Sequence, residues 1–416
     1  MDLLRRSPRN RFLFLTSNAG WGGSEELWSS VAQFLANEGH EVMAQVGWHD
    51  KGDPRLQRLR DLGCKIQTGW IAESLPGFRH PLMDRVLNRL NRMIHALRFR
   101  FFIHFNSDQD LVIISQGGNC DGLLLAEICL SKGMPYVLIA HKAAEVYWPS
   151  DAVLPRLRKI YADALHCFFV SSHNLRLTEE QLGMGLTRAS VVRNPFLVPW
   201  NWDGGWPESS GVFNLACVGR LQPSEKGQDI LLRVLARPKW RQRPLRVTFF
   251  GSGGFRNGLE GMAKLLKLDS VTFGGFVRDV ASIWKTHHAL VLPSRCEGLP
   301  LVVVEAMLHG RLPILTNVAG NGEVVEEGRT GFLAAAPTED ALDAAMENAW
   351  IRRHEWQEIG AAASVAIRQI VPPNPPATMA AMLLELVHGP RPDGVEENRP
   401  APLATAIPAL PQTEDA

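Results

Sequence analysis

The sequence predicts a two-domain α/β protein in which two doubly wound parallel sheets face a central cleft. Two observations carry this prediction. Short apolar runs alternate with helical patterns in both halves of the chain, and a segment rich in Pro, Gly and Trp at 194–211 interrupts the alternation. Apolar runs without a polar face are typical of strands in a parallel sheet that helices cover on both sides. The length of 416 residues also favours two domains over one core.

The strand-like runs divide into two sets. The first set predicts a domain at 1–198 and comprises 11–17, 40–47, 110–117, 135–142 and 166–172, with a helix at 24–38. After a linker at 199–211, the second set predicts a domain at 212–374 and comprises 213–220, 245–253, 270–277, 289–295 and 312–317. Ligands of such sheets bind at the carboxyl ends of the strands, so we expect a ligand cleft between the domains.

The end of the chain predicts helix and then disorder. A helical pattern runs from Pro337 to about Ile370, a Pro-rich break occupies 371–376, and a short helix follows. The remainder at 389–416 is rich in Pro and Ala. It has too few large apolar side chains to offset the entropy of ordering, and we expect it to be disordered.

Composition excludes several classes of protein. A formal net charge of +1 gives no overall field for nucleic acid, and the six scattered cysteines have no zinc-ligand spacing. The first apolar run is too short for a signal peptide, and no segment reaches the length of a membrane span. We therefore expect a cytoplasmic protein. The basic amphipathic stretch 82–105 leaves peripheral contact with the inner face of a membrane as an alternative, although a surface helix on the first domain is favoured.

Two carboxylates stand out in the segment 293–317. Seven residues separate Glu297 from Glu305, a strand ends just before the first, and a helix is predicted to begin near Leu301. A carboxylate can accept two hydrogen bonds from vicinal hydroxyls of a ribose or hexose. The turn before the helix presents backbone N–H groups that suit a phosphate or a sugar. The alternative is that Glu297 caps the helix and Glu305 is a solvated helix residue.

With its flanking residues, this segment resembles the E-x7-E signature of the retaining family 4 glycosyltransferases, the large group 1 family. The resemblance implies the GT-B fold, with two Rossmann-like domains and a final helix at about 375–388 that packs back on the first. It also implies that Glu297 contacts the donor sugar and Glu305 the ribose. The backbone that approaches the sugar and diphosphate would be that of Gly298, Leu299, Pro300, Leu301 and also Val302.

Two cations follow the first strand of the second half. Arg220 and Lys226 flank a turn that contains a proline, and such a pair can converge on one diphosphate. Fixed cations there stabilise the charge that develops on a departing β-phosphate. The alternative is two solvated loop cations, but the resemblance assigns both to the diphosphate. It also places Val277 near the base, with Arg278 as a flanking residue.

The first domain supplies two further candidates. Gly23 lies in a glycine turn that opens a helix, with Ser24 as the predicted N-cap. A plain strand-to-helix turn is equally compatible, but with Glu25 the turn resembles the GG-x-E opening of the family, which faces the donor phosphates and the acceptor. His141 ends a predicted strand at the expected cleft, where the family has a His near the donor sugar. A lone His is more often structural.

The resemblance implies transfer of a sugar with retention of configuration. The donor would be a nucleotide sugar, UDP- or GDP-linked, and the acceptor a lipid-linked, glycan or small molecule of bacterial cell-surface or exopolysaccharide synthesis. We expect no cofactor, no nucleic-acid partner and no metal, because we expect the chain to lack the Asp-x-Asp triplet of metal-dependent transferases. The alternatives are a non-catalytic scaffold of the same fold or a GT-B sugar-nucleotide epimerase, which would need its own acid and base.

Overall fold

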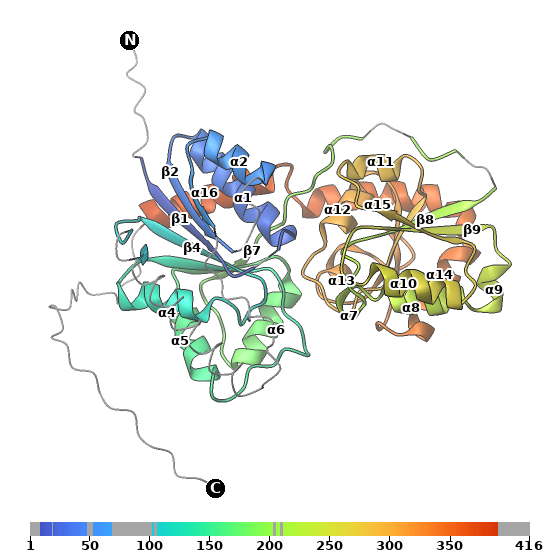
Figure 1. Cartoon of the computed structure of the whole chain (residues 1–416), viewed down its shortest axis with the longest axis horizontal. Helices are drawn as coiled ribbons and strands as arrows, with labels where there is room; N and C mark the ends of the chain where they lie inside the picture. The colour runs from blue at the N-terminus through green and yellow to red at the C-terminus, as the bar shows by residue number, and fades with distance from the viewer. Residues whose placement is uncertain are drawn as a thin grey trace, which may run out of the picture.

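A computed structural model describes residues 9–18, 20–47, 53–68, 102–103, 106–202, 205–208 and 211–389. They form two α/β domains side by side, each built on one parallel sheet (Figure 1). The predicted fold class is confirmed. Nearly all of the basic stretch 82–105, and the tail beyond residue 389, lie outside the described residues. Within the described ranges, no helix is both long and apolar enough to cross a membrane.

The sheet of the first domain contains seven parallel strands in the order β3-β2-β1-β4-β5-β6-β7. Their bounds are β1 Arg11–Thr16, β2 Glu41–Val46, β3 Lys65–Thr68, β4 Leu111–Gln116, β5 Tyr136–Ala140, β6 His166–Phe169 and β7 Ala189–Val191. The strand order reverses between β1 and β4, which is the switch point where open sheets bind ligands. The edge strands β3 and β7 were not predicted. Both are short and none of their residues is buried, so they lack the apolar run that marks the central strands.

Helices cover both faces of this sheet. One face carries α1 (Gly23–Asn37), α2 (Pro54–Asp61) and α16 (Pro375–His388), and the other carries α4 (Leu123–Ser131), α5 (Leu154–Asp163) and α6 (Ser172–Leu182). Alternate residues of β1 serve the two cores: Phe12 and Phe14 face α1, whereas Leu13 and Leu15 face α4. Because both faces are buried, the strand is apolar throughout.

The sheet of the second domain contains six parallel strands in the order β10-β9-β8-β11-β12-β13. Their bounds are β8 Phe213–Val218, β9 Leu245–Phe250, β10 Val271–Gly275, β11 Ala289–Leu292, β12 Leu312–Thr316 and β13 Phe332–Ala334. The order reverses between β8 and β11, so the second domain repeats the switch point of the first. Strand β13 was also missed by the sequence analysis, since it is only three residues long.

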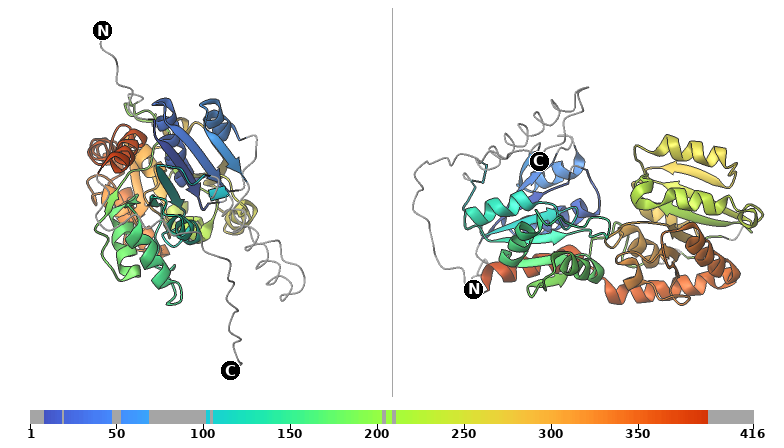
Figure 2. Two further views of the ribbon diagram at one scale, coloured as in Figure 1. Left: turned by 90° about the vertical axis from the view of Figure 1, so that its left-hand side faces the viewer. Right: turned by 90° about the horizontal axis from the view of Figure 1, so that it is seen from below.

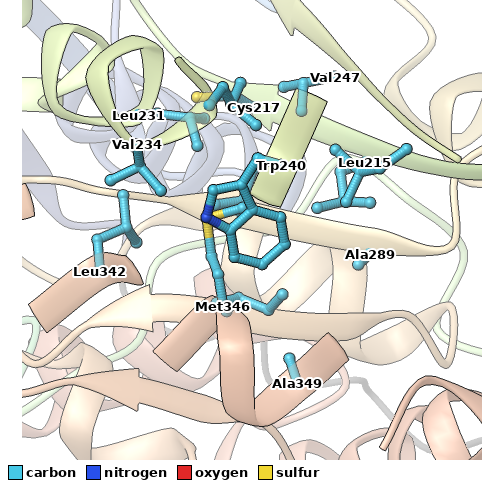
Figure 3. Close-up of a cluster of buried hydrophobic side chains, with 14 of the residues drawn as sticks. Leu215, Cys217, Leu231, Val234, Trp240, Val247, Ala289, Leu342, Met346 and Ala349 are labelled. Carbon is cyan, nitrogen blue, oxygen red and sulfur yellow. The ribbon is translucent and has the colours of Figure 1, made fainter. Parts of the chain in front are cut away.

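Two layers of helices cover this sheet as well. One face carries α7 (Pro223–Lys226), α8 (Gln228–Leu235), α9 (Pro238–Arg241), α10 (Arg256–Leu265) and α14 (Glu339–Ile351). The other carries α11 (Val280–Trp284), α12 (Leu301–Leu308), α13 (Asn321–Val324) and α15 (Trp356–Ile370). Trp240 lies in the core between this sheet and the helices α8, α10 and α14, with Leu231 and Met346 beside it (Figure 3). Its indole N–H donates to Asp343 at 2.6 Å.

The end of the described chain returns to the first domain. The long helical pattern after Pro337 is interrupted by a 3-10 turn at Arg353–Glu355, so that α14 and α15 are separate helices. The next helix, α16, begins inside the predicted break at Pro375, since Pro is tolerated in the first turn of a helix. Its Met379, Ala380 and Leu383 are fully buried in the core that includes α1. Figure 2 shows α16 against the first domain.

The predicted linker is anchored to the second domain by its tryptophans. Trp200 packs with the core beneath α12, and the ring of Trp202 lies 4.3 Å from that of His309. Trp206 covers the guanidinium of Arg311 at 5.4 Å. The aromatic content of this segment is therefore explained by packing rather than by ligand binding.

A small set of contacts joins the two domains. On α13, Glu323 accepts a hydrogen bond from the backbone N–H of His173 at 2.7 Å and lies 3.4 Å from Arg193. The side chain of Asn194 donates to the carbonyl of Leu299 at 3.2 Å. With these contacts in place, the carboxyl ends of the strands in the two sheets face each other.

Candidate active site

A cleft of about 840 Å³ lies between the domains. Its walls are the loops that follow β1, β4 and β5 in the first domain, and β8 and β11 in the second. The predicted residues that line it are Gly23, His141, Arg220, Lys226, Glu297, Gly298, Leu299, Pro300, Leu301 and Glu305, together with Glu25 and Val302. Residues from both domains therefore share one cavity.

Glu297 and Lys226 form a closed ion pair in this cleft. The lysine Nζ lies 2.6 and 2.7 Å from the two carboxylate oxygens, and the Ser294 hydroxyl donates to one of them at 2.7 Å. The N-cap of α12 is Pro300, and Glu297 makes no cap hydrogen bond to the helix. The alternative that Glu297 is a helix cap is therefore wrong. Both groups offer polar atoms to the cleft.

The turn that carries Lys226 is fixed to the loop that carries Glu297. Arg295 makes a bidentate pair with Asp229, at 2.6 and 2.9 Å, and also donates to the carbonyl of Pro223. Between them Gly227 has a φ of +63°, and an added Cβ would lie 1.9 Å from the carbonyl oxygen of Pro293. The two loops thus form one unit, in which the spacing of cation and carboxylate is set by backbone contact.

The other predicted cation, Arg220, is more exposed than Lys226 and has a different partner. Its guanidinium lies 3.2 Å from Glu225, whose other oxygen accepts a hydrogen bond from Lys142 of the first domain at 2.9 Å. Burial alone raises the pKa of Glu225, but the hydrogen bond and charge of Lys142 and the charges of Arg220 and Lys226 outweigh it and lower that pKa. Sequence reasoning missed both Lys142 and Glu225, although each directly adjoins a predicted residue.

Glu305 is buried in the second turn of α12. One carboxylate oxygen accepts a hydrogen bond from the backbone N–H of Leu197 at 2.9 Å. Burial raises the pKa of this carboxyl to about 7, with the hydrogen bond from Leu197 lowering it and the charge of Glu26 adding to the rise. The alternative of a solvated helix residue is wrong, because Glu305 is only 3% exposed. A buried carboxyl that lines a cleft is a group poised to bind hydroxyls.

His141 follows β5 at the base of the cleft. Its Nε2 lies 3.1 Å from the hydroxyl of Ser115, and its Nδ1 is buried. Burial lowers the pKa of the imidazole to about 3, so the ring is neutral near pH 7. Its carbonyl oxygen abuts Gly298, where an added Cβ would lie at 2.1 Å. The residue therefore offers a neutral imidazole to the cleft and packs against the Glu297 loop.

The glycine turn after β1 meets the second domain. An added Cβ at Gly23 would lie 2.7 Å from the side chain of Leu301 on α12. The predicted N-cap was wrong by two residues: Gly22 caps α1, because the carboxylate of Glu25 turns back and accepts from its N–H at 2.9 Å. Ser24 instead donates its hydroxyl to the same carboxylate. The loop is thus held rigid from within.

Val277 does not line the cleft. Its side chain packs against the core shared by α11 and α12, and Val280 lines the cavity instead. Arg278 is exposed and is also absent from the lining. The glycines at 251 and 253 serve packing, since an added Cβ at Gly251 would lie 1.9 Å from the carbonyl oxygen of Gly219.

The chain does contain an Asp-x-Asp triplet, at 108–110, and the expectation that it has none was wrong. Asp110 accepts a hydrogen bond from the backbone N–H of Arg11 at 2.7 Å, and Asp108 pairs with the Arg11 side chain. The triplet precedes β4, so the length of a strand, about 20 Å, separates it from the cleft. Within the described ranges, no three His, Cys, Asp or Glu side chains gather as metal ligands.

Comparison with known proteins assigns the second domain. Residues 212–350, which include Arg220, Lys226, Glu297 and Glu305, match the model of the family Glycosyl transferases group 1. This part of the chain is therefore similar to the group 1 glycosyltransferases. An uncharacterized glycosyltransferase of Haemophilus influenzae is 40% identical over 124 residues, which are 28% of this chain and 33% of that protein. Glycogen synthase of Mycobacterium tuberculosis is 30% identical over 182 residues, 43% of each chain.

The chain covers less than half of the length of these curated relatives. Solved structures align more fully. Anabaena HepE in complex with UDP and glucose has a TM-score of 0.68 at 20% identity, over 90% of this chain and 99% of that one. Sucrose-phosphate synthase of Thermosynechococcus elongatus has a TM-score of 0.68 at 16% identity, over 91% and 99%. The fold that carries the group 1 domain is therefore GT-B.

Proposed function

We propose that this chain is a retaining, metal-independent glycosyltransferase that moves a sugar from a nucleoside-diphosphate sugar to an acceptor hydroxyl. The observation that carries the proposal is the convergence of two buried carboxylates and two cations in one interdomain cleft. The group 1 domain supports the reaction class. The complex of Anabaena HepE with UDP and glucose supports UDP-glucose as the first donor to test.

The contacts of the cleft suggest how the donor is held. Lys226 donates to both oxygens of Glu297, and a diphosphate competes for the same ammonium. Once the lysine turns to the phosphate, the carboxylate of Glu297 is available to accept hydrogen bonds from sugar hydroxyls. Glu305 would accept the ribose hydroxyls in the same way.

The chemistry follows from the charges. The bond between the anomeric carbon and the phosphate oxygen breaks with its electron pair on the phosphate, and Lys226 and Arg220 stabilise that charge. The acceptor oxygen attacks from the same face and its proton passes to the departing phosphate oxygen. This route leaves Glu297 as a clamp on the sugar rather than a nucleophile, which agrees with its two hydrogen-bond partners.

The test is a panel of UDP-, GDP-, ADP- and dTDP-sugars with the full chain, in the presence of EDTA. We expect slow hydrolysis of one donor, transfer to an added acceptor, and an unchanged anomeric configuration by NMR. Lys226→Ala and Arg220→Ala should each lower turnover by about two orders of magnitude. Glu297→Gln should lose turnover with an unchanged melting temperature.

Other outcomes separate the alternatives. Near-normal turnover in the Lys226 and Arg220 variants would contradict the roles proposed for these two residues. Binding of a nucleotide sugar without turnover would indicate a scaffold protein, and interconversion of the donor without an acceptor would indicate an epimerase. Loss of turnover in EDTA would contradict the metal-independent mechanism.

A further inference from the structure

The first domain contributes a cation to the cleft whose role the proposed function leaves open. Lys142 follows β5 and lies next to His141. Among the described first-domain residues that line the cavity, it is the only Lys or Arg. Its ammonium group crosses to the second domain and donates to Glu225 at 2.9 Å, over a separation of 83 residues in the chain.

This contact places Lys142 beside the proposed diphosphate site. Glu225 accepts from Lys142 with one oxygen and pairs with Arg220 through the other, at 3.2 Å. Glu225 also immediately precedes Lys226 on α7. One carboxylate therefore joins the ammonium of the first domain to the cations that the second domain would offer to the diphosphate.

The environment keeps Lys142 charged and partly accessible. Its side chain is 23% exposed. Burial alone lowers the pKa of Lys142, but the hydrogen bond and charge of Glu225 outweigh it and raise that pKa above its usual value. A lysine ammonium on a four-carbon stem can change partners without a movement of the backbone.

We propose that Lys142 is a third phosphate-binding cation, which exchanges Glu225 for the β-phosphate of the donor. The inference rests on the proposed function and adds a catalytic residue from the first domain. A phosphate oxygen is an equivalent partner for an ammonium, and it gains negative charge as the glycosidic bond breaks. Because the other cations belong to the second domain, Lys142 would also couple donor binding to the closed arrangement of the two domains.

The competing interpretation is that the Lys142–Glu225 pair is only a clasp between the domains. Two substitutions break the same bond and distinguish these interpretations. Lys142→Gln removes the cation, whereas Glu225→Gln removes its partner and leaves the cation in place. If the pair is only a clasp, the two variants should lose equal amounts of diphosphate affinity and turnover. If Lys142 binds the phosphate, Lys142→Gln should lose more than Glu225→Gln.

The decisive measurement is the affinity of the nucleoside diphosphate and of the matching monophosphate, by titration calorimetry on the full chain. We expect Lys142→Gln to weaken binding of the diphosphate about tenfold or more, since a charge-assisted hydrogen bond is lost, and to leave the monophosphate unchanged. Turnover should fall by at least the same factor. Glu225→Gln keeps the cation of Lys142, so it should lose much less diphosphate affinity and turnover than Lys142→Gln. Lys142→Arg should keep most of the affinity.

Lys132→Gln is the matched control, because Lys132 is an exposed lysine of the first domain at the end of α4. Equal losses in Lys142→Gln and Glu225→Gln, or an unchanged diphosphate affinity in Lys142→Gln, would overturn the role of Lys142 while the wild-type chain remains active. Absence of both nucleotide binding and turnover in the wild type would instead overturn the proposed function, and this inference with it.

Discussion

At the scale of single residues, burial of Glu305 in the cleft makes stability depend on pH. Its ordinary pKa is 4.5, and burial raises it to about 7 in the folded chain. The fold therefore favours the protonated carboxyl. Stability from this group is fully present below pH 4.5, declines as the pH rises, and is lost as the pH passes about 7.

Glu305→Gln tests this directly, because glutamine resembles the protonated carboxyl and can keep the hydrogen bond from Leu197. At pH 5 we expect the variant and the wild type to melt at nearly the same temperature. At pH 8 the variant should melt higher by about 5 °C or more, since about 2–3 kcal/mol of stability is lost by ionisation of the buried glutamate. Thermal melts at the two pH values give the comparison. A shift of the same size at both would show that Glu305 does not titrate in this window.

The sequence identified the residues of this site that belong to a recognisable motif. Glu297, Glu305, Arg220 and Lys226 belong to that group and all line the cleft. Lys142 and Glu225 do not, because their contact forms only when two separately folded domains meet. The pKa shift of Glu305 was not predicted either, since it depends on the burial of this carboxyl in the folded chain. The side chain of Val277 packs against the core beside the cleft, and its place near a base stays a prediction.

At the scale of elements, the turn between α7 and α8 determines where Lys226 lies. Gly227 occupies the left-handed region with a φ of +63°, and the carbonyl of Pro293 leaves no room for a Cβ. A side chain here would be strained twice, by the backbone conformation and by the overlap.

Gly227→Ala should therefore move Lys226 away from Glu297 and lower stability by about 1–3 kcal/mol. We expect weaker binding of the nucleoside diphosphate in proportion. Gly261→Ala is the matched control, because Gly261 lies in α10 with nothing within 4 Å of an added Cβ. That change should raise stability by up to about 1 kcal/mol. Equal stability of the two variants, measured in urea, would contradict the packing at Gly227.

Element boundaries show what a sequence pattern can and cannot predict. The central strands were found because burial on both faces makes them apolar throughout. The family resemblance places the final helix at about 375–388, and α16 begins at Pro375, because a first-turn proline needs no N–H partner. The cap of α1 was misplaced because Glu25 folds back onto Gly22, a contact that composition alone does not reveal.

At the scale of the whole molecule, the two domains do not divide cleanly along the chain. The helix α16 follows the second domain in sequence but packs on α1 of the first, where Leu383 is fully buried. The first domain is therefore completed only by residues near the end of the described chain (Figure 1). The stability of the first domain should therefore depend on a helix that begins at Pro375, far beyond the end of its last strand at Val191.

Leu383→Ala tests whether α16 stabilises the first domain or the adjacent second domain. Removing a fully buried leucine should lower the stability of the first domain by about 2–5 kcal/mol. Calorimetry on the full chain should show the lower melting temperature in a transition that nucleoside diphosphate does not restore fully, because the proposed diphosphate contacts of Arg220 and Lys226 lie in the second domain. Leu265→Ala on α10 is the control, since Leu265 is 79% exposed and its loss should matter by less than about 0.5 kcal/mol. Hydrogen exchange then assigns the effect: faster exchange in β1 and α1 is expected, whereas faster exchange confined to α14 and α15 would place α16 with the second domain instead.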